Sequence, residues 1–184
     1  MYICLIILVL LIFFICFLIS KRITKKNNEI IRIKKELINS LYNIIKYIPE
    51  LVQISEKNIE YEDDIFNNLK SAKIKFENIN SNVLEYSKFY DELIKNINSL
   101  FTISEAYKDL NTSKEFLSSK DIITNGISDF QKVKSNYNEK VTKYNEYIKI
   151  FPKNILAKLL KFNEIDLFLN PDKNYSQIKS LEKE

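Results

Sequence analysis

The chain lacks most of the residue types from which catalytic and metal sites are built. Its 184 residues include no histidine, no tryptophan, one glycine and three prolines, and its two cysteines, Cys4 and Cys16, both precede residue 20. Such a sequence indicates neither a zinc site, nor a disulfide framework, nor a nucleophile–base pair. Scarce glycine also argues against a phosphate-binding loop, and scarce glycine and proline argue against a β architecture with many tight turns. We therefore expect no enzymatic activity, no metal ion and no cofactor.

What the chain does have is a long apolar run at its start. Residues 2–19, YICLIILVLLIFFICFLI, are eighteen consecutive apolar side chains, which would span roughly 27 Å as a helix and so cross a bilayer. No basic residue precedes the run and no small-residue cleavage site follows it, so residues 1–20 are predicted to be a retained transmembrane anchor. A buried core helix is the weaker alternative, because globular helices are rarely apolar on every side. Both cysteines would then face lipid.

Basic residues gather directly after this run, at Lys21, Arg22, Lys25 and Lys26, whereas no charged side chain precedes it. The positive-inside rule therefore places the N-terminus outside and the following domain in the cytoplasm, in a single pass of a bacterial inner membrane. Residues 21–27 are predicted to be a basic linker that lies against anionic lipid headgroups. The expected partners are accordingly the lipid bilayer and an unknown protein near the membrane.

The positive net charge is confined to this flank. Residues 21–35 hold seven basic and one acidic side chain, which leaves 21 basic and 23 acidic side chains in residues 36–184. A nucleic-acid-binding domain would be expected to carry a basic face on its folded part. No nucleic-acid partner is therefore expected.

Beyond the anchor, apolar residues recur at alternating spacings of three and four, as the core side of a packed helix requires. Four such stripes predict an all-α fold, in which the transmembrane helix is followed by an antiparallel four-helix bundle with long helices at residues 28–168 and a disordered tail at 169–184. A kink is predicted at Pro49, and Thr112 is expected to cap the last long helix together with Glu115. The stripes comprise Ile30, Ile33, Leu37, Leu41, Ile44, Ile48 and Leu51; Ile65, Leu69, Ala72, Phe76 and Ile79; Tyr86, Tyr90, Leu93, Ile97, Leu100, Ser104 and Tyr107; and Ile123, Ile127, Phe130, Lys134, Tyr137, Val141, Tyr144, Ile148 and Phe151.

The fourth stripe contains a repeat, because Tyr-Asn occurs twice, one heptad apart, in YNEKVTKYNEYIKIFP. Tyr137 and Tyr144 are predicted to be successive core residues. Asn138 and Asn145 flank this seam and are expected to hydrogen-bond to a neighbouring helix.

The stripe ends at Phe151, which is predicted to be the last core contact before Pro152 stops the helix. Pro152 would then open a short helix, KNILAKLLKF, whose apolar residues alternate with lysines.

Lys134 is the one charged member of the four stripes. An unpaired ammonium at a core position is costly, so a carboxylate partner is expected, and Glu105 beside the third stripe is the candidate. The alternative is that the long side chain of Lys134 reaches from the seam to solvent.

These segments carry a resemblance to a known family. YNEKVTKYNEYIKIFPKNILAKLLKF resembles the C-terminal signature of the bacterial LemA family, IPELV resembles its Ile-Pro-Asn-Leu-Val motif, SAK its Ala-Arg, and SEAYKDL its Glu-x-Tyr-Pro-x-Leu element. The resemblance implies a four-helix bundle on a membrane stalk, and it implies no established enzymatic activity. The family-motif positions, to which it assigns a structural role, are Pro49, Ala72, Tyr107, Tyr137, Asn138, Tyr144, Asn145, Phe151 and Pro152.

The chain departs from the family pattern at charged positions. Lys73 and Lys134 stand where the family usually has Arg, Lys108 stands where it has Pro, and Ile127 occupies an acidic position. Lysine is a point donor that cannot form a bidentate pair, so any carboxylate–guanidinium pair of the relatives is not expected here.

Two functions remain open at this stage. The first is a non-enzymatic scaffold that docks protein partners at the membrane through exposed helix faces. The second is a sensor whose aromatic bundle core binds a small apolar or lipid-like ligand. A cavity of roughly 300 Å³ or more would favour the sensor, whereas a core packed at normal density would exclude it.

Overall fold

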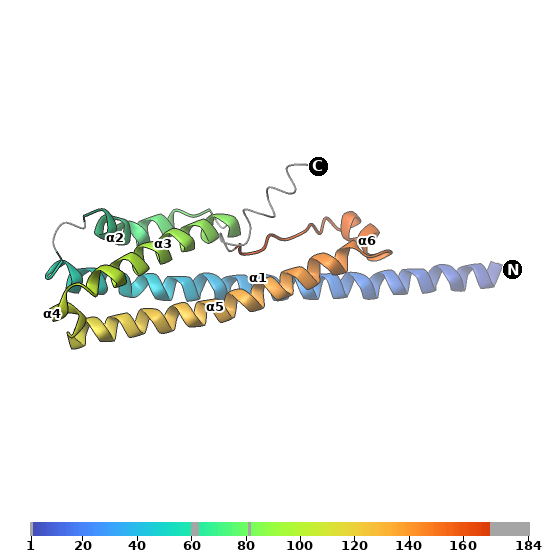
Figure 1. The fold of residues 1–184 in the computed structure, drawn as a ribbon. Coiled ribbons are helices and arrows are strands. Elements are labelled where there is room, and N and C mark those ends of the chain that lie inside the picture. Colours follow the sequence, from blue (N-terminus) through green and yellow to red (C-terminus); the bar gives the residue numbers. More distant parts are fainter. Residues whose placement is uncertain (1, 60–62, 81, 170–184) are drawn as a thin grey trace, which may run out of the picture. The chain divides into compact units, whose positions relative to one another are not determined.

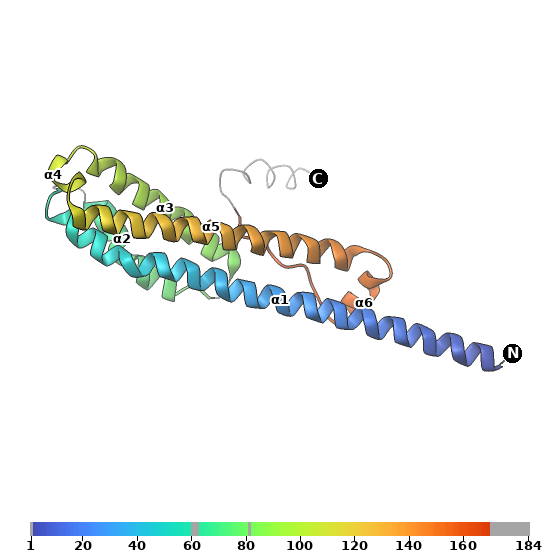
Figure 2. The same cartoon turned by 90° about the horizontal axis from the view of Figure 1, so that it is seen from below.

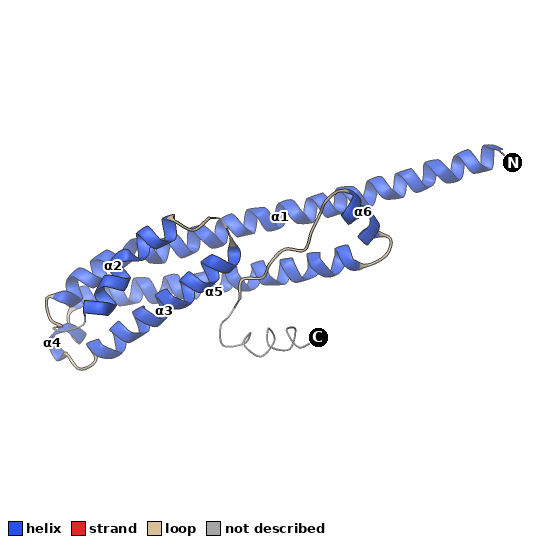
Figure 3. Ribbon diagram, turned by 90° about the horizontal axis from the view of Figure 1, so that it is seen from above, coloured by secondary structure: helices blue, strands red, loops and turns tan. Residues whose placement is uncertain are grey.

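A computed structural model describes residues 2–59, 63–80 and 82–169 and contains six helices in this part of the chain (Figure 1). They are α1 (Tyr2–Glu56), α2 (Asp63–Glu77), α3 (Val83–Ser104), α4 (Lys108–Asn111), α5 (Lys114–Lys149) and α6 (Lys153–Leu159). The described residues form helices and connecting loops without a strand (Figure 3), which confirms the all-α prediction. Most of the tail predicted at 169–184 lies outside the described residues.

The chain divides into two compact units. Residues 1–35 and 136–167 form the first unit, and residues 36–135 and 168–184 form the second. The long helices α1 and α5 each contribute to both units. Residues 21–27, predicted to be a linker, are helical and belong to the uninterrupted α1, and Pro49 also lies inside this helix.

In the first unit, α1 and α5 pack through the stripes that the sequence predicts. Ile30 and Ile33 of α1 are buried, as are Tyr137, Val141, Tyr144 and Ile148 of α5. Ile23, one heptad before the predicted stripe of α1, is buried as well. At the edge of this packing the Lys140 ammonium lies 2.6 Å from the Glu29 carboxylate, which lowers the pKa of Glu29. Figure 2 shows the two helices side by side along this stretch.

In the second unit, aromatic side chains join neighbouring helices. Phe76 of α2 lies 5.8 Å from Tyr42 of α1 and 5.4 Å from Tyr86 of α3, measured between ring centroids. Tyr90 of α3 stacks on Phe130 of α5 at 4.3 Å. These rings are large apolar surfaces, so their burial supplies much of the hydrophobic stabilisation of this unit.

The one glycine of the chain marks a close approach between α1 and α5 in the second unit. A Cβ atom at Gly126 would lie 3.2 Å from Cγ1 of the buried Ile44. A hydrogen atom there lets the two helices pack closely, which offsets the low helix propensity of glycine.

Local signals determine where several helices begin. Asn82 caps α3, since its Oδ1 accepts a hydrogen bond from the Leu84 amide at 2.9 Å. At α5 the hydroxyl oxygen of Ser113 accepts from the Phe116 amide at 3.4 Å, so Ser113 caps this helix and the prediction of Thr112 is wrong. The Thr112 hydroxyl instead donates a hydrogen bond to the Lys108 carbonyl. Thr112 is the C-cap of the short helix α4, which lies between the two long helices α3 and α5.

Helix α6 ends in a Schellman motif. The Phe162 amide donates to the Ala157 carbonyl at 2.8 Å, and the Lys161 amide donates to the Lys158 carbonyl at 3.2 Å. Lys161 has φ = 58°, the left-handed conformation that this motif requires and that glycine usually supplies. The motif directs the chain from α6 into an extended segment, residues 162–169, which we call the strap.

Candidate functional site

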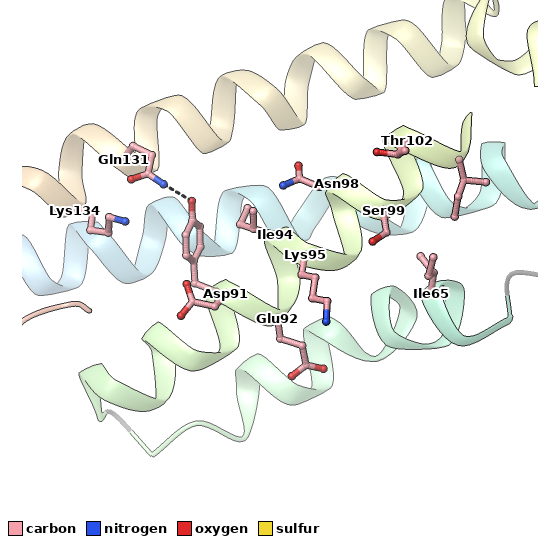
Figure 4. Close-up of a pocket in the computed structure, with 12 residues that line it drawn as sticks. Ile65, Asp91, Glu92, Ile94, Lys95, Asn98, Ser99, Thr102, Gln131 and Lys134 are labelled. Atoms are coloured by element: carbon pink, nitrogen blue, oxygen red, sulfur yellow. Dashed lines mark hydrogen bonds between the residues drawn. The ribbon is translucent and has the colours of Figure 1, made fainter. Parts of the chain in front are cut away.

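An open groove of about 1160 Å³ in the second unit is the candidate site, and we call it the α3 groove. Side chains of α2, α3 and α5 line it, and most of them project from one side of α3 (Figure 4). Two acidic and two basic residues, several amides and hydroxyls, and three isoleucines share the lining. The lining residues are Ile65, Tyr90, Asp91, Glu92, Ile94, Lys95, Asn98, Ser99, Thr102, Ile103, Gln131 and Lys134.

Tyr90 lines the α3 groove and connects two helices. The amide nitrogen of Gln131 donates a hydrogen bond to the Tyr90 hydroxyl at 2.7 Å (Figure 4). Burial raises the pKa of Tyr90 to about 12, although the bond from Gln131 acts in the opposite direction. The phenol therefore stays neutral at physiological pH and positions the Gln131 side chain on the groove wall.

Lys134 is buried, as its place in the fourth stripe predicts, with 6% of its surface exposed. Its ammonium lies 5.5 Å from the centroid of the Tyr90 ring and 6.0 Å from that of Phe168, within the range of cation–π attraction. Burial lowers the pKa of Lys134, while the negative charge of Asp91 raises it. The side chain thus reaches the groove wall rather than open solvent. The alternative in which Lys134 extends from the seam to solvent is therefore wrong.

The predicted pairing of Lys134 with Glu105 is wrong. Glu105 is exposed just beyond the C-terminal end of α3, far from Lys134. The reason is the register of α3 on α5. Phe101 lies against Phe116, which places the nearby Glu105 level with the start of α5, and Lys134 stands 18 residues, about 27 Å, farther along that helix.

In the first unit, Asn145 holds the strap to α5. Its amide nitrogen donates to the Ile165 carbonyl at 2.9 Å, and its amide oxygen accepts from the Ile165 N–H at 3.0 Å. One residue farther on, the Asp166 carbonyl accepts a hydrogen bond from the Tyr137 hydroxyl at 2.9 Å. Both predicted motif residues therefore make structural contacts, but Asn145 bonds to an extended segment and not to a neighbouring helix.

The repeated Tyr-Asn pairs are not equivalent. Tyr137 and Tyr144 are both fully buried, which confirms their predicted core positions. However, the Tyr144 hydroxyl has no hydrogen-bond partner among the described residues. Asn138 is half-buried on the same side of the helix as Asn145, one heptad earlier.

The prediction that Phe151 is the last core contact is wrong. Its side chain is 74% exposed, because α5 already ends at Lys149 and the chain turns before the next stripe position is reached. The Phe151–Pro152 peptide bond is cis, and Pro152 then stands as the N-cap of α6. A short helix after Pro152 is confirmed, although it ends at Leu159.

The other predicted residues lie in different parts of the chain. Lys21, Arg22 and Lys25 are exposed on α1, whereas Lys26 is half-buried with its ammonium 5.3 Å from the Tyr147 ring centroid. Of the remaining motif positions, Pro49 is exposed, Ala72 is buried in α2, and Tyr107 is the half-buried N-cap of α4.

Sequence reasoning missed both the strap contacts and the α3 groove. The contacts of the strap are made by backbone groups of Ile165, Asp166 and Leu169. The Leu169 carbonyl, for example, accepts a hydrogen bond from the Ser87 hydroxyl at 2.7 Å. Backbone groups leave no mark in a sequence. The one signal that could have revealed the strap is its apolar content, since Phe168 is among the largest fully buried side chains.

Comparison with known proteins agrees with the motifs. A search of curated proteins gives no match. The sequence profile of one family matches residues 33–179, which is most of the chain and includes the packed part of α1, the α3 groove and the strap. The match begins after the apolar run at residues 2–19 of α1. On this evidence the chain belongs to the LemA family.

Proposed function

We propose that the protein is a membrane-anchored, non-enzymatic interaction module, whose folded part faces the cytoplasm and docks a protein partner. The observation that carries this proposal is the continuity of α1. An 18-residue window of this helix has a mean hydropathy of 3.5, and none of the window is buried within the protein. The same helix continues into buried residues of the first unit such as Ile30 and Ile33, so an unbroken helix would link a bilayer around the apolar part to this unit.

The helical segments of the folded part are proposed to form an antiparallel four-helix bundle. Contacts between α1 and α2, α2 and α3, α3 and α5, and α5 and α1 support this arrangement. In the second unit, α5 residues 119 and 126 meet α1 residues 50 and 44 respectively, which is the order expected of helices that run in opposite directions.

The α3 groove is the proposed docking site for the partner. Its lining alternates isoleucines with charged and amide side chains and carries no excess of either charge sign. Such a mixture suits a peptide segment with apolar anchors and polar flanks, because protein interfaces combine apolar contacts with about one hydrogen bond per 100–200 Å².

The proposal is tested by cross-linking in living cells, followed by purification of the full-length protein and identification of the attached proteins. Asn98→Arg places a bulky cation in the groove at an exposed position, so it should spare the fold and abolish the specific cross-link. Asn125→Arg is the matched control, since Asn125 is exposed on α5 and does not line the groove. Identical cross-linked proteins for the wild type and Asn98→Arg would reject the groove as the docking site.

A second candidate function, a ligand sensor, is favoured by the volume of the α3 groove. The groove is larger than the roughly 300 Å³ at which small-molecule sites begin. Its charged lining, however, suits a polar ligand better than the apolar ligand expected from the sequence. Thermal unfolding of the full-length protein against a panel of polar metabolites would test this, because a ligand that binds only the folded state raises the midpoint. The sensor would be rejected if no compound raised the unfolding midpoint of the wild type more than it raised the midpoint of Asn98→Arg.

A further inference from the structure

The end of α5 and the helix α6 expose a second apolar surface outside the long apolar run. Ile155 and Leu159 are 57% and 75% exposed, and together with the exposed Phe151 they follow one another at intervals of four residues. Ala157, on the other side of α6, is buried. Helix α6 therefore packs through a small residue and directs its large apolar side chains outward, whereas a water-facing helix would show the opposite pattern.

The charged side chains within this segment of the chain are all basic. Residues 147–163 contain four lysines, Lys149, Lys153, Lys158 and Lys161, and no acidic residue. Glu164 pairs with Lys149 at 3.0 Å, and the Lys153 ammonium lies over the Tyr147 ring at 4.1 Å. Lys158 and Lys161 are exposed beside Leu159. A short helix that combines exposed apolar residues with lysines has the composition of an element that lies in the interface of an anionic membrane.

The position of the surface within the first unit fits the same partner. The Lys26 ammonium lies 5.3 Å from the Tyr147 ring, and Lys140 pairs with Glu29, so α5 approaches the apolar run as its residue numbers rise. Figures 1 and 2 both show α6 beside the N-terminal half of α1. No other element of the first unit covers Phe151 or Leu159.

Helix geometry gives the height of the surface above the membrane. The apolar run ends at Ile19, seven residues before Lys26, or roughly 10 Å along α1. From Tyr147, whose ring centroid lies 5.3 Å from the Lys26 ammonium, α5 continues two residues to its end at Lys149, or about 3 Å toward the membrane. The end of α5 and the turn that follows it would then stand about 7 Å above the hydrocarbon, within a headgroup layer that is about 5–8 Å deep.

We infer that residues 150–160, with Phe151, Ile155 and Leu159 at their centre, are a second membrane contact that inserts into the lipid interface beside the anchor. This inference rests on the proposed function, because it requires α1 to be anchored in the bilayer. The contact fixes the folded part against the membrane at two points, so the first unit has a defined orientation on the lipid surface.

The absence of tryptophan makes a direct test available, because any introduced Trp is the only one in the protein. Full-length Leu159→Trp is reconstituted into vesicles of phosphatidylcholine and phosphatidylglycerol, without bromine or with bromine on the acyl chains, placed near the headgroup in one set of vesicles and deep in the chains in a second set that serves the variant within the apolar run. Bromine quenches Trp fluorescence only at close range. We expect bromination near the headgroup to reduce the emission of Leu159→Trp, as for an interfacial side chain, and to leave the emission of a solvent-exposed Trp unchanged.

Two further single-Trp variants make the result interpretable. Phe13→Trp lies in the middle of the apolar run and reports anchoring, and Asn136→Trp lies at an exposed position of α5, about 22 Å along the helix from Phe151. Phe151→Trp repeats the measurement at the second large exposed side chain. Circular dichroism confirms that each variant keeps the helix content of the parent.

The outcomes separate the inference from the proposed function. Quenching of Phe13→Trp and Leu159→Trp, but not of Asn136→Trp, supports the second contact. Quenching of Phe13→Trp alone overturns the inference and leaves the anchor standing, in which case a protein partner is the occupant of the surface. Equal quenching of Leu159→Trp and Asn136→Trp overturns it as well, since the folded part would then lie on lipid without specificity. An unquenched Phe13→Trp rejects the anchor itself.

Discussion

Hydroxyl groups distinguish the two tyrosines that stand one heptad apart in α5. The Tyr137 hydroxyl donates to the Asp166 carbonyl, whereas the Tyr144 hydroxyl is buried without a partner among the described residues. A hydrogen bond contributes about 1 kcal/mol net, but a buried polar group left unpaired costs about 1–3 kcal/mol. Two residues with the same place in the sequence pattern should therefore respond oppositely to the loss of the hydroxyl.

We accordingly predict that Tyr137→Phe lowers the free energy of unfolding by about 1 kcal/mol and that Tyr144→Phe leaves it unchanged or raises it. Thermal unfolding of the full-length protein in detergent, followed by circular dichroism, measures both. A loss of 1 kcal/mol should lower the midpoint by about 2–4 °C in a protein of this size. Equal midpoints for the two variants would show that the hydroxyl environments do not differ as described.

Tyr137 should also make the fold sensitive to alkali. Burial, aided by the charge of Asp166, raises its pKa from 10.0 to about 12. A group whose pKa is raised on folding stabilises the protein below its unfolded pKa, and this contribution is lost as pH rises through the folded pKa. The wild type should thus lose more stability between pH 10 and pH 12 than Tyr137→Phe does. Parallel curves of stability against pH for the two proteins over this window would contradict the raised pKa of Tyr137. The variant should still lose some stability, because the pKa of Tyr90 is also about 12.

Asn145 is predicted to control the strap locally. Asn145→Ala removes two hydrogen bonds to Ile165, a loss of about 2 kcal/mol, which should accelerate amide exchange at Ile165 about 30-fold. Hydrogen–deuterium exchange of the full-length protein measures this. Asn145→Asp keeps the acceptor and loses the donor, so its effect should be intermediate. Unchanged exchange at Ile165 in the alanine variant would mean that Asn145 does not hold the strap.

At the scale of elements, the strap is expected to contribute to stability through Phe168. This ring packs edge-on against Phe130 at 5.4 Å and Tyr90 at 6.0 Å and is almost fully buried, whereas the adjacent Leu167 is 37% exposed. Phe168→Ala should cost about 3–5 kcal/mol, and Leu167→Ala under about 1 kcal/mol, because only the former leaves a cavity in a packed core. Thermal unfolding of the two full-length variants gives the difference. Similar midpoints would show that the strap is not part of the core.

The helical elements could be predicted from the sequence because their cause is local. Spacings of three and four place Ile30, Leu93 and Val141 on buried sides of their helices, and the structure confirms these positions. The strap could not be predicted in this way, since its contacts are made by backbone carbonyls and amides. Hydrophobic periodicity carries no information about them.

Contacts between elements were harder to predict than the elements. The sequence pairs Glu105 with Lys134 because Lys134 stands in one stripe and Glu105 beside another, but stripes give the buried side of a helix and not the height at which two helices meet. The register follows from which rings pack together, such as Phe101 on Phe116. The prediction for Phe151 fails for a related reason. The heptad spacing assigns Phe151 to the core, but α5 has already ended at Lys149.

At the scale of the whole molecule, the charges around α1 bear on its orientation in a membrane. The basic residues after the apolar run are helical, and three of the four are exposed, so their charges remain available to lipid headgroups. Lys140, Lys143 and Lys149 of α5 and both lysines of α6 lie in the same unit as the run. Basic residues close to a span oppose its transfer across a bilayer, so the positive-inside rule predicts that the folded part stays in the cytoplasm.

We therefore predict that a fluorescent protein fused to the C-terminus is fluorescent in bacterial cells and that alkaline phosphatase fused there is inactive. Replacing Lys21, Arg22, Lys25 and Lys26 by Gln while adding lysines before Tyr2 should invert part of the population, because the bias in basic residues close to the span sets the orientation. The matched control replaces Lys70, Lys73, Lys88 and Lys95 by Gln, which removes the same charge far from the span in sequence and should leave the orientation unchanged. Active phosphatase on the unmodified chain would place the folded part outside the cytoplasm and would remove every cytoplasmic protein from the possible partners of the α3 groove.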